Sequence, residues 1–165
     1  MKYCSECAQK LILKSCGDEG EIPYCPSCRK FYFDLFPVCV LIVLFSADKK
    51  RICLLKQNYV HQNYHVLIAG YVKKGETPEQ TVRRETLEET GIEVLKCDYA
   101  ASYFHEKSGA LMLGFTAVAS CEEFCLTSAE VDGATWVCAD EAAALLRPNS
   151  TGAHLLAEAL KKSVR

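Results

Sequence analysis

The fold is decided by residues 70–92, which read GYVKKGETPEQTVRRETLEETGI. Thr77 is suited to cap a helix, Pro78 suits the first helical position, and Gln80 completes a capping box with Thr77. Gly91 is a typical C-terminal stop, because glycine adopts the left-handed conformation without strain. The segment therefore predicts a helix that starts at Pro78 and ends just before Gly91.

This helix carries an unusual group of carboxylates. Glu85, Glu88 and Glu89 stand at positions i, i+3 and i+4, so they share one helical face. Their repulsion costs a few tenths of a kcal/mol per pair, and the C-terminal end of the helix dipole also disfavours anions. A bound Mg²⁺ would offset both effects, whereas the alternative is a solvated acidic face. Arg84 can reach Glu88 one turn along and Glu76 across the preceding loop, which favours an organised site.

The flanking sequence changes from a helical period to short runs rich in β-branched and aromatic residues. We expect strands over residues 37–45, 51–56 and 65–69 before the helix, and 94–103, 111–119 and 135–138 after it. The first two strands should form a hairpin, and further helices are expected at 141–146 and 152–161. This order predicts a mixed α/β sandwich with helices against a sheet. A change in composition near residue 35 divides the chain into two domains, 1–35 and 36–165.

Composition limits the class of protein. Half of the 165 residues are hydrophobic and 24% are charged, so a folded core is expected. The net charge of −2 gives no strong indication of a nucleic-acid partner, and there is no polybasic run suited to a membrane. We expect a cytoplasmic protein, because no signal peptide is apparent and the longest apolar run is shorter than the roughly 20 residues of a membrane span. A secreted disulfide scaffold is the competing interpretation of the eleven cysteines.

Four of these cysteines form two Cys-x2-Cys pairs. Cys4 and Cys7 are separated by 17 residues from Cys25 and Cys28. This spacing is typical of a zinc ribbon, in which four thiolates complete a closed, structural Zn²⁺ site. The alternative is that these cysteines are incidental. Residues 1–35 hold five basic and five acidic side chains, so a phosphate-binding face on the ribbon is poorly supported. Cys16 is interpreted as a spare, and the six cysteines from Cys39 onward as mainly core-filling residues.

With these residues identified, residues 70–92 resemble the Nudix box, Gly-x5-Glu-x7-Arg-Glu-U-x-Glu-Glu-x-Gly-U, where U is a bulky aliphatic residue. The positions in register are Gly70, Glu76, Arg84, Glu85, Glu88, Glu89, Gly91 and Ile92. Thr86 departs from the pattern at a U position. A zinc ribbon directly before such a box resembles the NADH pyrophosphatase-like branch of the Nudix family. The Ser-Gln-Pro-Trp-Pro-Phe-Pro array of NADH-specific members is replaced by SYFHEKS at residues 102–108, so a preference for NADH is not implied.

The resemblance implies a Nudix-type α/β/α sandwich with a mixed sheet, and metal-dependent hydrolysis of a nucleoside diphosphate linked to another group. It implies these ligands for a catalytic Mg²⁺ or Mn²⁺: Glu85, Glu88, Glu89, Glu130 and the Gly70 carbonyl. Glu89 is the first candidate for general base and Glu130 the second. Glu76 and Arg84 are expected to orient the ligands. Lys73 occupies a position that is commonly acidic in related boxes, which alters the rim of the metal site.

Aromatic side chains near the box are candidates for contacting a nucleobase. We expect substrate contacts from Tyr71, Tyr103, Phe104, His105 and Phe115. The alternative is that the phenylalanines pack in the core and that His105 lies in a surface loop.

Three functions remain open at this stage. The first is hydrolysis of an NAD(H)-like dinucleotide, ADP-ribose or a similar nucleotide-type small molecule. The second is a non-catalytic nucleotide sensor with a Nudix fold. The third is an RNA 5′-cap hydrolase that uses the ribbon as an adaptor. No membrane partner is expected, and relatives suggest a possible homodimer.

Overall fold

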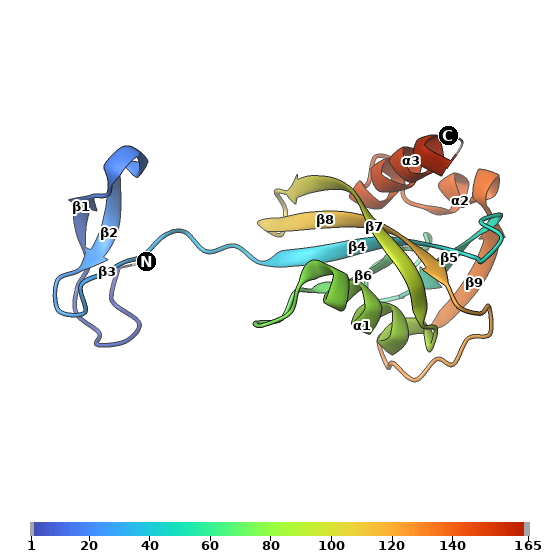
Figure 1. Ribbon diagram of the computed structural model, residues 1–165, viewed down its shortest axis with the longest axis horizontal. Helices are drawn as coiled ribbons and strands as arrows, with labels where there is room; N and C mark the ends of the chain where they lie inside the picture. Colours follow the sequence, from blue (N-terminus) through green and yellow to red (C-terminus); the bar gives the residue numbers. More distant parts are fainter. Residues whose placement is uncertain (1, 164–165) are drawn as a thin grey trace. The chain divides into compact units, whose positions relative to one another are not determined.

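The computed structural model describes residues 2–163 (Figure 1). The chain splits after Phe36 into two compact units. We describe each unit by itself. Among the described residues, no helix has the length and apolar character needed to cross a membrane.

The first unit is a small antiparallel sheet, coloured blue in Figure 1. Its elements are β1 (Ile12–Ser15), the 3-10 helix η1 (Gly17–Glu19), β2 (Glu21–Cys25) and β3 (Lys30–Phe31). Among its described residues, Cys4 and Cys25 are the only buried ones. Apolar burial therefore contributes little to this unit.

The second unit is built on a six-stranded sheet. Its strands are β4 (Val38–Phe45), β5 (Arg51–Lys56), β6 (Ile68–Tyr71), β7 (Val94–His105), β8 (Ala110–Ala119) and β9 (Gly133–Cys138). They lie in the order β7-β8-β4-β5-β9, and β6 pairs with β4. The β4–β8 pair is parallel and the other pairs are antiparallel, so the sheet is mixed, as expected.

Three helices cover the two faces of this sheet (Figure 1): α1 (Pro78–Thr90), α2 (Ala139–Leu145) and α3 (Thr151–Ser163). Successive β4 side chains point to opposite faces. Ile42 packs in a buried cluster with Val82 of α1, whereas Val43 packs in a second cluster with Leu155 and Leu156 of α3. The result is a three-layer α/β/α sandwich, as predicted.

The predicted start and stop of α1 are confirmed. The Thr77 hydroxyl accepts from the Gln80 backbone N–H at 3.3 Å, and the Gln80 side chain accepts from the Thr77 N–H at 2.8 Å. Gly91 ends the helix in the left-handed conformation, with φ of 74°. Local capping signals therefore fix the helix that carries the carboxylates.

Two expectations for the strands need correction. The third strand begins at Ile68 rather than at residue 65, because Val66 and His65 instead form isolated bridges with Leu55 and Leu146. The expected hairpin of β4 and β5 is paired in register only at its turn end, between residues 45 and 52. It opens because β6 occupies the β4 edge farther along.

The expectation for the cysteines is also only partly right. Cys39 and Cys53 are buried as predicted, but Cys121, Cys125 and Cys138 are exposed. Cys138 lies at the end of its strand, and the other two lie in the segment between β8 and β9.

Candidate active site

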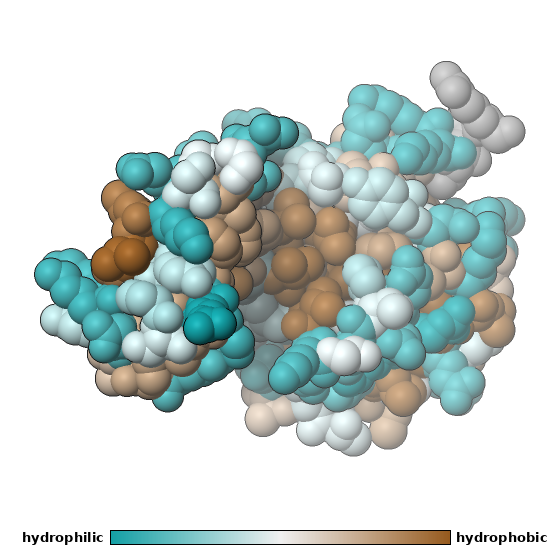
Figure 2. Space-filling model, turned by 60° about the vertical axis from the view of Figure 1, so that its left-hand side comes forward, coloured by the Kyte–Doolittle hydropathy of each residue, from teal (hydrophilic) through white to brown (hydrophobic). Residues whose placement is uncertain are grey.

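The second unit contains a cleft of about 730 Å³. Figure 2 shows a hollow on this unit where hydrophobic side chains gather. One group of lining residues is charged or polar and comes from α1 and nearby loops, including Arg84, Glu85, Glu88 and Glu130. Another group is apolar and comes from β4, β8, the segment before β6 and the end of α2: Leu41, Met112, Leu67 and Leu146. The cleft therefore offers both carboxylates and an apolar surface to one ligand.

Arg84 organises the charged lining. Its Nε and Nη2 bind the two Glu76 carboxylate oxygens at 2.7 and 2.9 Å, as a two-pronged contact. Its Nη1 donates to Glu85 at 2.5 Å and to Glu88 at 3.0 Å, and its Nη2 donates to the Tyr71 carbonyl at 3.0 Å. The Arg84 hydrogen bond lowers the pKa of Glu76 to about 2. The Arg84 guanidinium thus connects the loop that carries Glu76 to α1. This contact is what the predicted orienting roles of Glu76 and Arg84 require.

Gly70 lets the helix approach the sheet closely. A Cβ built on Gly70 would lie 1.9 Å from the Glu85 Cδ, well inside van der Waals contact. The Glu85 carboxyl therefore lies directly against the β6 backbone, and only glycine leaves room for it. This burial raises the pKa of Glu85.

Glu89 is the most buried carboxylate of the group, with 5% of its surface exposed. Burial, followed by repulsion from Glu85, raises its pKa to about 7. Its Oε1 accepts a hydrogen bond from Gln57 Nε2 at 3.1 Å. Its Oε2 is buried and has no hydrogen-bond partner among the described residues. A buried carboxylate oxygen without a partner fits a cation or water ligand that completes the site.

The hard, all-oxygen donor set also suits a divalent cation such as Mg²⁺ or Mn²⁺. Glu85 and Glu88 line the cleft, Glu89 lies behind its wall, and Glu130 faces it from the loop before β9. The structure therefore brings Glu85 and Glu88 of α1 and Glu130 of a distant loop to one cleft, although no three of the predicted carboxylates among the described residues lie within 4.8 Å of one another. Arg84 holds Glu85 and Glu88 and would share these carboxylates with a cation.

The predicted base-contacting residues occupy different places. Tyr71 and His105 line the cleft, and His105 Nδ1 lies 2.7 Å from the Ser108 hydroxyl. Phe115 is buried in the core, with its ring against that of Tyr99. Tyr103 and Phe104 are not among the cleft-lining residues, and Tyr103 packs against the cluster beneath α3.

The sequence did not predict several of the residues that line the cleft. Gln57 and Tyr59 enter the cleft from the loop after β5, and Met112 enters from β8. None of the three belongs to the Nudix box, and Met112 lies in a Leu-Met-x-x-Phe strand that was not interpreted as part of the site. Their only common signal is a position at or beside a strand end.

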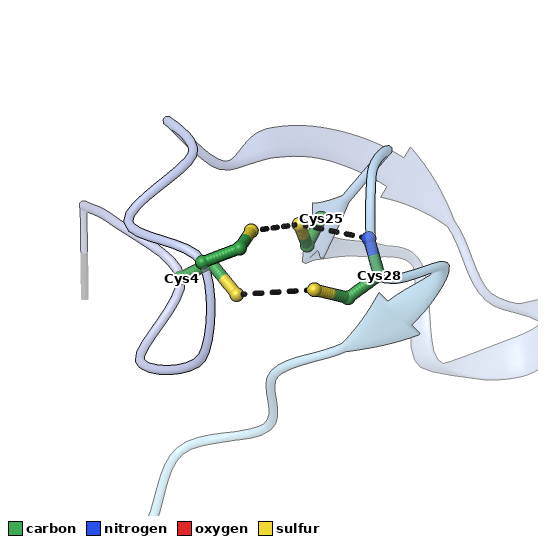
Figure 3. Close-up of side chains that lie close together, drawn as sticks. Cys4, Cys25 and Cys28 are labelled. Carbon is green, nitrogen blue, oxygen red and sulfur yellow. Dashed lines mark hydrogen bonds between the residues drawn. The ribbon is translucent and has the colours of Figure 1, made fainter.

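The four predicted zinc ligands do come together. Their ligand atoms all lie within 4.8 Å of one another, as in no other His, Cys, Asp or Glu group of three or more among the described residues. Figure 3 shows the side chains of Cys4, Cys25 and Cys28 gathered at one place. The Cys4 Sγ lies 3.8 Å from the Cys28 Sγ, and the Cys7 Sγ lies 3.6 Å from the Cys25 Sγ. A tetrahedral site with Zn–S bonds of about 2.3 Å requires sulfur separations of about 3.8 Å. The cluster therefore fits a zinc ion.

Comparison with known proteins agrees with this geometry. Residues 35–158 match the model of the NUDIX domain. This match covers most of the chain, so the protein belongs to the NUDIX family.

Two curated relatives match the chain over most of its length. The chain is 30% identical over 156 residues to the NAD-capped RNA hydrolase NudC of Escherichia coli, a match covering 94% of this chain and 58% of the relative. NudC of Citrobacter koseri is 32% identical over 133 residues, or 80% of this chain and 51% of that one. The chain thus spans little more than half the length of these curated relatives.

Solved structures share the fold. A NUDIX hydrolase from Nitrosomonas europaea superposes with a TM-score of 0.74 at 22% identity, covering 98% of this chain and 92% of that one. The NUDIX domain of Shewanella oneidensis NrtR, solved with ADP ribose, gives a TM-score of 0.67 at 19% identity, covering 85% and 94%.

Proposed function

We propose that this protein hydrolyses the diphosphate bond of a nucleoside diphosphate derivative in a reaction that depends on Mg²⁺ or Mn²⁺. The observation that carries the proposal is the cleft itself. Glu85 and Glu88 line it together with an apolar surface, and Glu89 is buried behind its wall. A diphosphate fits the charged part, and a base or ribose-linked group fits the apolar part.

Glu85, Glu88, Glu89 and Glu130 would hold the divalent cation, with the Gly70 carbonyl beside them. Such a cation supplies charge neutralisation for the phosphate oxygens and helps to activate water. Arg84 holds Glu85 and Glu88 in place before the substrate arrives. This preorganisation lowers the cost of assembling the site around an anionic transition state.

Glu89 is our candidate for general base. Its buried Oε2 has no hydrogen-bond partner among the described residues, so this oxygen is available to a proton from the attacking water. Water attacks one phosphorus, its proton passes to the Glu89 carboxylate, and the bridging P–O bond breaks. The two products each carry one of the original phosphates.

The substrate class that we favour is a dinucleotide such as NAD(H), or ADP-ribose. The curated relatives are NAD-capped RNA hydrolases, which supports an NAD-capped RNA 5′ end as a second candidate. In either case, we propose that the Cys4 cluster holds a structural Zn²⁺, because its closed set of four thiolates leaves no position for a reacting water.

The test is a substrate panel with purified, zinc-loaded protein. NADH, NAD⁺, ADP-ribose, nucleotide sugars and a short NAD-capped RNA would each be incubated with Mg²⁺ or Mn²⁺. Glu89→Gln should lower kcat by at least about 10²-fold, because it removes the proton acceptor. The matched control is Glu79→Gln, an exposed glutamate on the first turn of the same helix.

Metal-dependent cleavage that Glu89→Gln abolishes and Glu79→Gln preserves would support the proposal. Equal activity of Glu89→Gln and the wild type would remove Glu89 as the base. Tight nucleotide binding without turnover of any substrate would favour the sensor function instead.

A further inference from the structure

The contact between Gln57 and Glu89 joins two buried polar side chains that are far apart in sequence. Gln57 is 6% exposed and Glu89 is 5% exposed. The Gln57 Nε2 donates to Glu89 Oε1 at 3.1 Å across a separation of 32 residues. Burial makes this hydrogen bond important, because a buried polar group that loses its partner is left without water to replace it.

The backbone fixes Gln57 in place. The residue directly follows β5, and its carbonyl accepts the N–H groups of Val60 and His61, each at 3.0 Å. The preceding carbonyl, that of Lys56, accepts the Asp132 N–H at 2.8 Å. The Gln57 amide therefore extends from a rigid turn rather than from a free loop.

The two Glu89 oxygens have different surroundings. Oε1 is occupied by the Gln57 amide, whereas Oε2 is buried and has no partner among the described residues. The Gln57 amide is the side-chain donor that restricts rotation of this carboxylate, to which the Ala69 backbone also hydrogen-bonds. Gln57 lines the cleft, whereas Glu89, to which it donates, is not among the lining residues.

We propose that Gln57 is a positioning residue: its amide holds Glu89 by Oε1 and so reserves Oε2 for the catalytic divalent cation and its water. This inference rests on the proposed function. Residues that orient metal ligands by hydrogen bonding commonly change metal affinity or activity by about 10–100-fold when they are removed.

The experiment uses the full, zinc-loaded chain and the variant Gln57→Met, which keeps the length of the side chain and removes the donor. Mn²⁺ affinity is measured by electron paramagnetic resonance without substrate, and kcat and KM are measured with a substrate that the wild type cleaves. We expect Mn²⁺ binding to weaken by about 10-fold or more and kcat to fall by a similar factor, with KM changed less than about twofold. Gln62→Met, an exposed glutamine on the same loop, is the matched control and should behave as the wild type.

A double variant tests whether Gln57 acts through Glu89. If it does, adding Gln57→Met to Glu89→Gln should change Mn²⁺ affinity and residual kcat no further. Gln57→Asn withdraws the amide by one carbon without adding apolar surface, so it should repeat the loss if Gln57→Met folds poorly. Independent, multiplying effects of the two substitutions would overturn the inference, as would wild-type Mn²⁺ affinity in Gln57→Met and Gln57→Asn.

The Mn²⁺ titration separates the two proposals. If the wild type binds Mn²⁺ but cleaves no substrate, the proposed function fails and the change in Mn²⁺ affinity still decides the role of Gln57. If the wild type cleaves a substrate but does not bind Mn²⁺ in its absence, the role of Gln57 fails and the proposed function stands.

Discussion

Each of the two units is stabilised internally by a different kind of interaction. The first has Cys4 and Cys25 as its only buried described residues, both within the thiolate cluster. The second buries two apolar clusters, one on each face of its sheet. On our proposal the first unit folds around a metal, because metal binding would supply the free energy that apolar burial does not. A longer segment supports its own core and can then bury a charged group such as Glu89.

The largest effect expected from this contrast follows removal of a thiolate. Cys25→Ser should abolish zinc binding and unfold the first unit, because structural zinc contributes about 10–16 kcal/mol in small ribbons. The second unit should keep its own unfolding transition. Zinc content and backbone NMR spectra of the full chain would show both effects, and loss of all dispersed signals would contradict the independence of the two units.

The reverse experiment deletes core volume from the second unit. Leu156 of α3 is fully buried, so Leu156→Ala should lower the free energy of unfolding of this unit by about 2–5 kcal/mol. Zinc content should stay unchanged. Denaturant titration would measure the loss, with Leu126→Ala as a control at a 40% exposed leucine.

A smaller effect is expected from Glu89, the buried carboxylate of the second unit. The pKa of Glu89 rises from 4.5 to about 7 on folding, so the folded state binds more protons than the unfolded state between these values. The free energy of unfolding should therefore fall as pH rises through this window, by about 3 kcal/mol without divalent cations. Glu89→Gln should be more stable than the wild type at pH 8 but not at pH 4.5, as measured by urea titration of the second unit.

A stability difference that is independent of pH would show that Glu89 ionises as readily in the folded state as in the unfolded state. Adding Mg²⁺ at pH 8 should stabilise the wild type more than Glu89→Gln, because the cation interacts with the ionised carboxylate.

The smallest effect belongs to the surface of the first unit. Lys30 and Glu6 form an ion pair at 2.6 Å, but both side chains are more than half exposed. Exposed pairs contribute little, so Glu6→Gln should leave zinc retention against a chelator within about twofold of the wild type. A much faster release would show that this pair supports the metal site.

The sequence predicted most of what depends on local signals. Thr77 and Gly91 bound α1, and the spacing of its glutamates placed them on one face. Contacts set by tertiary pairing were not predictable in this way. The displacement of β6 and the opening of the β4–β5 hairpin depend on which strand occupies the β4 edge. Gln57 meets Glu89 only after the loop following β5 has packed against α1.

The close approach at Gly70 has a consequence for redesign of this cleft. Any side chain at position 70 would overlap the present position of Glu85. Even the smallest substitution of Gly70 therefore displaces that carboxylate. Met112 and Leu146 line the apolar surface and carry no part of the carboxylate network. On the proposed function, libraries that vary these two positions would alter the apolar surface offered to a substrate and leave the carboxylates in place, so that selectivity could be redesigned apart from the chemistry.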